Sequence, residues 1–133
     1  MSILGYYGQE LVNSKIMKKY FFKIMFFVTI ITIEFLATTT TVHIEIVENI
    51  WDKANHFMAF FTLYILLSFG FLQLNIIKKT VFLLLFGIQI EIVQHFIDGR
   101  FFSMLDVFAD SIGIFIGVVA MKILIKKPTK AFS

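Results

Sequence analysis

The chain has 133 residues, of which 59% are hydrophobic and 18 are phenylalanine, and its mean hydropathy is +0.87. So little polar surface cannot cover a water-soluble globule of this size, which indicates that lipid is the solvent. The absence of cysteine excludes disulfides, thiolate metal sites and cysteine nucleophiles. The net charge of +3 comes from lysines beside apolar segments, where they indicate membrane topology and not nucleic-acid binding.

Four apolar segments follow one another in the sequence, and each is close to the roughly 20 residues that cross a bilayer as a helix. They cover residues 20–42, 54–77, 80–97 and 105–125. The only proline, Pro128, lies beyond the last segment, so no segment is interrupted by proline. We therefore predict an all-α fold, an integral membrane bundle of four transmembrane helices.

The two ends of the chain are more polar than its middle. Residues 1–19 are predicted to form a loosely ordered tail with a weakly amphipathic patch. Lys18, Lys19 and Lys23, followed by an apolar run, also imitate a secretory signal peptide, but Glu34 inside that run favours a retained helix. The predicted organisation is a cytoplasmic tail at 1–19, a transmembrane domain at 20–126 and a second cytoplasmic tail at 127–133.

Lysine placement predicts the topology, because basic residues in short loops are retained on the cytoplasmic side. Ten of the twelve basic residues lie in the stretch up to Lys23, in a turn at Lys78 and Lys79, or from Lys122 onward. The remaining two are Lys53 and Arg100. We therefore predict a multi-pass protein with both termini in the cytoplasm.

Polar residues gather at the other, extracytoplasmic end of the predicted bundle. Asp52 and His56 share a helical face at the start of the second segment, and Glu91 and Gln94 share one near the end of the third, just before Arg100. The fourth segment adds a stripe of two carboxylates and two glycines: Asp106, Asp110, Gly113 and Gly117. A carboxylate at membrane depth should face the bundle interior, so we predict one outward-facing polar pocket at this end.

Three glycines and one further carboxylate have predicted structural roles. Gly113 and Gly117 form a small-xxx-small pattern, which brings another helix close, either within the bundle or across a homo-oligomer. Gly99 predicts a tight turn between the third and fourth segments. Glu34, at a depth similar to Glu91 and Asp110, is also expected to point into the bundle.

The order of these residues resembles a known family. The segments that carry the resemblance are 52–57 (DKANHF), 91–94 (EIVQ) and 99–106 (GRFFSMLD), extended by Asp110, Gly113 and Gly117. Over roughly residues 51–117 the chain is similar to the VanZ-like family of small bacterial membrane proteins. It departs from the family pattern at Asp98, where proline is common, and at Asp110, where asparagine is common. The resemblance implies the bacterial cytoplasmic (inner) membrane and a link to resistance to glycopeptide antibiotics, teicoplanin in particular.

The first functional hypothesis is binding of an anionic headgroup in the outer leaflet, from a membrane lipid or a lipid-linked cell-envelope precursor. Arg100 would hold phosphate or carboxylate with its planar fork, and Lys53 would assist. Three acids, Asp52, Asp106 and Glu91, would orient these basic groups. The predicted ligand-binding residues are Asp52, Lys53, Gln94, Arg100 and Asp110.

The alternative is a membrane-embedded enzyme, a phosphoester hydrolase or transferase that acts on the same lipids. His56 would be the general acid or base, with Asp52 orienting its ring. Glu91 and Asp106 would activate a nucleophile or bind a metal. The sequence leaves the metal and any cofactor undetermined, although carboxylate oxygens suit magnesium or calcium better than zinc.

Two other interpretations compete with these. The same polar residues could be an interhelical network that orders the bundle, since such contacts are worth about 1 kcal/mol each in membranes. A transporter or channel is disfavoured, because four short helices leave little room for a pathway. The acidic residues also do not line a route to Lys78 and Lys79.

Overall fold

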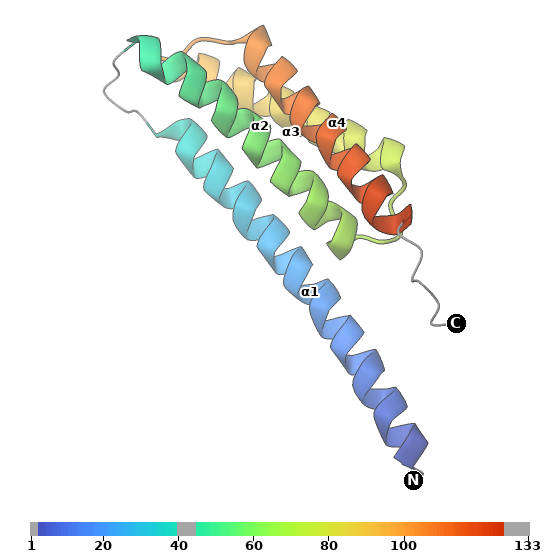
Figure 1. Cartoon of the computed structure of the whole chain (residues 1–133). Helices are drawn as coiled ribbons and strands as arrows, with labels where there is room; N and C mark the ends of the chain where they lie inside the picture. The colour runs from blue at the N-terminus through green and yellow to red at the C-terminus, as the bar shows by residue number, and fades with distance from the viewer. Residues whose placement is uncertain (1–2, 40–44, 127–133) are drawn as a thin grey trace.

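The computed structural model describes residues 3–39 and 45–126, with the side chains of 45–49 left out. This part of the chain forms helices joined by short connections and contains no strand (Figure 1). The helices are α1 (Ile3–Thr38), α2 (Glu45–Gly70), α3 (Ile76–His95) and α4 (Met104–Lys126). The predicted all-helical fold is therefore confirmed for the described residues.

Helix α2 is the centre of the bundle. It packs against each of the other three helices, most extensively against α4, whereas α1 contacts α2 and α3. Successive helices run in opposite directions, so the start of α2, the end of α3 and the start of α4 meet at one end of the bundle (Figure 1). The polar segments of the sequence are brought together there.

Helix α1 is much longer than the predicted first span. Its 36 residues extend over about 54 Å, against roughly 30 Å of hydrocarbon in a bilayer. Its buried residues, Phe26 and Ala37, lie in the second half, and the first half projects beyond the bundle (Figure 1). The expected loose tail is therefore wrong for residues 3–19, because a helix held by packing at one end extends through residues that contain no proline.

The connection between α2 and α3 also differs from the prediction. It covers residues 71–75, because Asn75 caps α3 and its side chain accepts a hydrogen bond from the backbone N of Lys78 at 2.8 Å. Lys78 and Lys79 therefore lie in the first turn of α3 and not in the connection. Lys79 is buried and its Nζ donates to Ser68 Oγ at 3.3 Å.

The core is built on one face of α2, whose buried residues recur every three or four positions. They are Phe60, Leu63, Tyr64 and Leu67. Helix α4 approaches this face closely, since a Cβ added at Gly113 would lie 2.4 Å from Phe57 O and one at Gly117 would lie 2.9 Å from Tyr64 Cβ. The predicted close approach is therefore made within the bundle, and association of two copies through these glycines stays a prediction.

The outer surface of the bundle is apolar. Large hydrophobic side chains are exposed on every helix, as shown by Leu4 on α1, Ile50 on α2, Ile77 on α3 and Ile125 on α4, each more than 70% exposed. Among the described residues, α1 and α4 are long and apolar enough to cross a membrane by length and composition. An apolar surface of this extent indicates contact with lipid. A passage of all four helices through the membrane stays a prediction.

Candidate functional site

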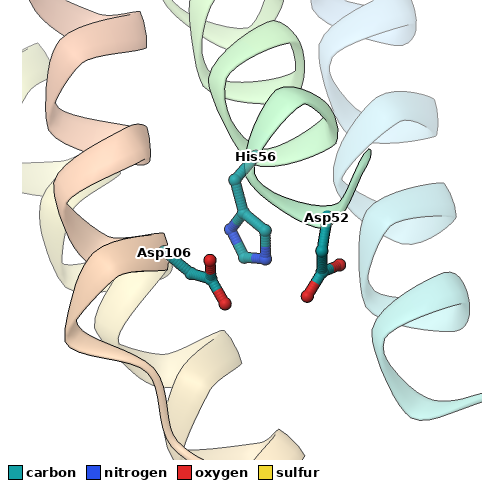
Figure 2. A group of neighbouring side chains, drawn as sticks. All are labelled: Asp52, His56 and Asp106. Atoms are coloured by element: carbon teal, nitrogen blue, oxygen red, sulfur yellow. The ribbon is translucent and has the colours of Figure 1, made fainter. Parts of the chain in front are cut away.

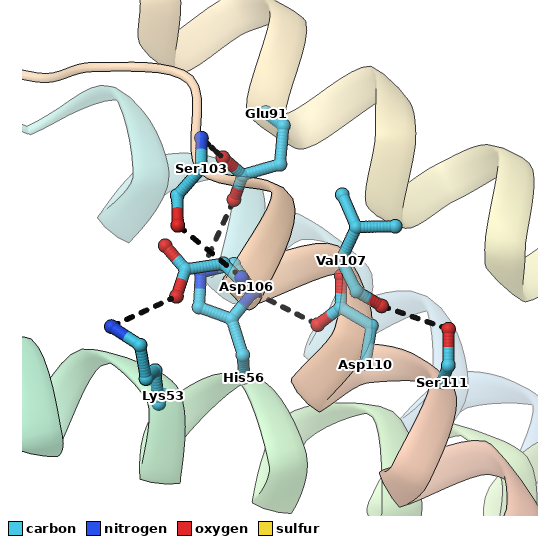
Figure 3. A network of polar contacts seen from close by, with 8 residues as sticks. All are labelled: Lys53, His56, Glu91, Ser103, Asp106, Val107, Asp110 and Ser111. Atoms are coloured by element: carbon cyan, nitrogen blue, oxygen red, sulfur yellow. Dashed lines mark hydrogen bonds and ion pairs between the residues drawn. The ribbon is translucent and has the colours of Figure 1, made fainter.

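The predicted site residues meet at one end of the bundle. We call this group the polar cluster, and Figure 3 shows part of it. It consists of Asp52, Lys53, His56, Glu91, Gln94, Arg100, Ser103, Asp106 and Asp110. They come from the early residues of α2, the last turn of α3, the connection that holds Arg100 and Ser103, and the first turns of α4. Segments distant in the sequence therefore form one group.

His56 is at the centre of the polar cluster, between two buried carboxylates. Its Nδ1 lies 2.8 Å from Asp110 Oδ1, and its Nε2 lies 3.6 Å from Glu91 Oε1. His56 is 8% exposed, and both carboxylates are fully buried. The ring is thus oriented by Asp110 on α4, where the sequence assigned that role to Asp52 on its own helix.

Glu91 ties the end of α3 to the connection that follows. Its Oε2 accepts a hydrogen bond from the backbone N of Ser103 at 2.9 Å. With the Gln94 amide turned so that its nitrogen donates to Glu91 Oε1 at 3.2 Å, its oxygen accepts from Arg100 Nη1. Gln94 therefore bridges the buried acid and the arginine, which is the local arrangement that holds Arg100 beside the cluster.

Ser103 and the turn before it place the start of α4. Gly99 has φ of +82°, a conformation that favours glycine, and Arg100 N donates to Ile97 O at 3.0 Å, which confirms the predicted tight turn. Ser103 Oγ then accepts from the backbone N of Asp106 at 3.3 Å, as an N-cap does. Asp106 lies in the first turn of α4, where the helix dipole stabilises a negative charge.

Asp52 and Lys53 form the rim of the cluster. Both are half-buried, and Lys53 Nζ lies 3.8 Å from Asp106 Oδ1. Asp52, His56 and Asp106 each present a ligand atom within 4.8 Å of the others, and the three side chains converge in Figure 2. The structure therefore brings every predicted site residue into one group, with the cations near the surface and the acids Glu91 and Asp110 beneath them.

The family model VanZ/LLP1 matches residues 3–125. The chain belongs to the VanZ/LLP1 family. The match extends well beyond residues 51–117, on which the resemblance in the sequence was based, and it includes α1. No curated protein and no solved structure matches the chain. Family membership and the two apolar helices both indicate a membrane protein.

Two residues of this VanZ/LLP1 chain matter to the site but were not assigned a role from the sequence. Ser103 caps α4, and its backbone N–H donates a hydrogen bond to Glu91. The pattern Ser-x-x-Asp before an apolar segment could have predicted this cap from the sequence. Gly87 lies against Asp110, because a Cβ added there would be 2.5 Å from Asp110 Oδ2. A glycine inside an apolar helix is a signal for such close approach.

Glu34 does not belong to the polar cluster of this VanZ/LLP1 chain. Its Oε1 accepts a hydrogen bond from Gln89 Nε2 at 2.9 Å. The two residues line a groove of about 500 Å³ between α1 and α3 that is otherwise mainly apolar. Glu34 therefore points toward α3, as expected of a carboxylate directed into the bundle, but it lies apart from Glu91 and Asp110 because α1 packs beside α3 and presents this position to Gln89.

The polar cluster allows three kinds of chemistry in this VanZ/LLP1 chain. The cations Lys53 and Arg100 can bind an anion, His56 can hold or release a proton beside its carboxylates, and the acids can bind a metal ion. The four carboxylates of the cluster outnumber its two permanently cationic side chains. The buried part therefore favours a proton or a cation, and only the rim favours an anion.

Proposed function

We propose that the chain crosses the membrane four times, with both termini in the cytoplasm and the polar cluster toward the outer side. Three observations support this topology. Successive helices alternate in direction, the apolar surface extends over every helix, and the lysines at the start of α3 and the end of α4 lie at the end opposite the cluster. Basic residues of that kind are retained on the cytoplasmic side.

At that outer face, the cluster is proposed to bind the anionic headgroup of a membrane lipid or a lipid-linked cell-envelope precursor. The observation that carries the proposal is the incomplete hydrogen bonding of the Arg100 guanidinium. Its Nη1 donates to Gln94, whereas its Nε is buried and makes no hydrogen bond within the described part of the chain. A buried donor without an acceptor is costly, and a phosphate or carboxylate oxygen would satisfy it.

The neighbours of Arg100 favour an anion that approaches from the surface. Arg100 is only partly buried, and the side chain of Lys53 on the opposite helix is 34% exposed. Gln94, itself hydrogen-bonded to Glu91, accepts a hydrogen bond from the guanidinium, so the planar fork is oriented before a ligand arrives. In this proposal the carboxylates position the cations and the headgroup contacts the cations.

Native mass spectrometry of the detergent-purified protein tests the binding of lipid. Replacing Lys53 and Arg100 together by glutamine should reduce retention of anionic phosphatidylglycerol by about tenfold or more, since charged hydrogen bonds are worth about 1.5–3 kcal/mol each. Lys78→Gln with Lys122→Gln is the matched control, because it removes two exposed lysines near the other end. Equal loss in both double variants, or in neither, contradicts a headgroup site at the cluster.

A role in glycopeptide resistance is a further part of the proposal, because the family resemblance implies it. Cells that express the chain should tolerate more teicoplanin than cells that carry the Arg100→Gln variant at the same membrane level. Equal susceptibility of the two strains separates the phenotype from the headgroup site.

The second candidate function is catalysis on the same lipids, and one observation favours it. The 2.8 Å contact between His56 Nδ1 and Asp110 fixes the ring, and a fixed histidine is suited to act as general acid or base. A screen of lipid phosphates for hydrolysis or transfer should then give turnover with the wild-type chain and none with His56→Ala. Retained phosphatidylglycerol binding without turnover in the wild type would favour binding over catalysis.

A further inference from the structure

Three side chains of the polar cluster are arranged as ligands of a metal ion. Asp52 and His56 are four residues apart on one face of α2, and Asp106 faces them from the first turn of α4. One ligand atom from each lies within 4.8 Å of the other two. Figure 2 shows the imidazole ring of His56 between the carboxylates of Asp106 and Asp52.

The carboxylate of Asp106 supplies an independent indication of a missing ligand. Asp106 is 5% exposed, and its Oδ1 makes no hydrogen bond within the described residues. Lys53 Nζ forms an ion pair with this oxygen across 3.8 Å, a distance too long for a hydrogen bond. A buried carboxylate oxygen without a hydrogen bond is destabilising, and a directly bound metal ion would supply the close contact that Lys53 does not make.

The orientation of His56 fits metal binding as well. Its Nδ1 is occupied by Asp110 at 2.8 Å, and its Nε2 is 3.6 Å from the nearest carboxylate oxygen of Glu91. A histidine that ligates a metal typically donates its other ring N–H to a carboxylate, which fixes the tautomer. With Asp110 in that role, Nε2 of His56 is the ring nitrogen left to bind an ion.

The net charge of the polar cluster also favours a metal cation. Its carboxylates are Asp52, Glu91, Asp106 and Asp110, and its permanent cations are Lys53 and Arg100. With His56 neutral, the negative charges exceed the positive ones by two, and Glu91 and Asp110 are fully buried. A divalent cation balances this excess, whereas an added anion alone increases it.

We infer that Asp52, His56 and Asp106 bind one divalent transition metal ion, zinc or manganese, within the polar cluster. An imidazole nitrogen with carboxylate oxygens suits these ions, whereas magnesium and calcium prefer oxygen ligands alone. Ligand atoms in a tetrahedral zinc site are roughly 3.3 Å apart, given bonds of about 2 Å. In this proposal the half-buried Asp52 side chain rotates inward to close this distance.

The inference goes beyond the binding of a headgroup. Substitution of Lys53 should weaken headgroup binding but should not weaken metal binding. If the cluster holds an anion, Lys53→Met weakens binding of phosphatidylglycerol. If Asp106 ligates a metal, the same substitution removes a competing cation, so zinc should bind at least as tightly as in the wild type. The failure of one proposal is therefore distinguishable from the failure of the other.

Isothermal titration of the tag-free, chelator-treated full chain with zinc and manganese chloride tests the site. We expect one ion per chain and magnesium far weaker. Asp52→Asn and Asp106→Asn should each lower the affinity by at least about tenfold, since even outer-shell changes cost 10–100-fold. Asp98→Asn, an exposed acid in the connection after α3, is the matched control and should change nothing.

Far-UV circular dichroism confirms that each variant is folded, and the half-buried Asp52 keeps the test decisive if Asp106→Asn unfolds. Absence of stoichiometric binding to the folded wild type overturns the inference. It is equally overturned if zinc and manganese bind with unchanged affinity to folded Asp52→Asn protein, because the ion then lies elsewhere.

Discussion

Gly113→Ala is the substitution that best tests how closely α2 and α4 pack. The added Cβ would lie 2.4 Å from Phe57 O and 3.1 Å from Phe61 N, both backbone atoms of α2 that no side-chain rotation can move. Since a carbon–oxygen contact is normally about 3.3–3.6 Å, the two helices must separate by about 1 Å. Overpacking of this kind typically lowers the free energy of unfolding by about 1–3 kcal/mol.

The same separation should reach the polar cluster. Asp110 is three residues before Gly113 on the same face of α4, and its Oδ1 lies 2.8 Å from His56 Nδ1 on α2. An opening of about 1 Å takes this contact beyond hydrogen-bond distance. Gly113→Ala should therefore weaken zinc binding as well as stability, although the substituted position contacts no predicted ligand.

Unfolding in mixed micelles of mild detergent and dodecyl sulfate, followed by far-UV circular dichroism, measures the change. Gly8→Ala is the control, because nothing lies within 4 Å of a Cβ added there and alanine favours a helix. It should unfold at the wild-type midpoint or slightly above it. A Gly113→Ala variant as stable as Gly8→Ala would refute the close packing of α2 on α4.

Two further outcomes are expected. Ser103→Ala should lower the free energy of unfolding by about 1 kcal/mol in the same assay, because α4 loses its N-cap, and Ser103→Asp should restore most of it; equal stability of all three proteins contradicts the cap. Because the chain has no cysteine, single cysteines at Asn13 and Gln73 should react with an impermeant maleimide only from the cytoplasm, and one at Asp98 only from outside. Labelling of Gln73 and Asp98 positions from the same side contradicts the four-span topology.

Part of the candidate site could be predicted from the sequence because helical spacing alone defines a face. Asp52 with His56, and Glu91 with Gln94, are fixed on common faces by the helix repeat. The apolar segments also predict where such faces must be hidden from lipid. These two facts are enough to predict that the polar residues gather at one end.

The contacts between those faces required the tertiary structure. Helical spacing does not say how far each helix is rotated or shifted against its neighbour, and that geometry decides which carboxylate meets which partner. Hence Asp110, and not Asp52, is hydrogen-bonded to the ring of His56, and Glu34 is hydrogen-bonded to Gln89. The helix ends also depended on local hydrogen bonds at Asn75, which hydropathy does not detect.

The sequence by itself therefore determined the helical class, the apolar surface, the tight turn at Gly99 and the gathering of the polar residues at one end. Each of these follows from composition, period or backbone conformation, which are properties of a single segment. The tertiary structure alone decided that Gly113 and Gly117 lie against α2 and that α1 extends to Ile3. It also decided that three acids from α3 and α4, Glu91, Asp106 and Asp110, lie around His56. These depend on the distance between helices, which no single segment specifies.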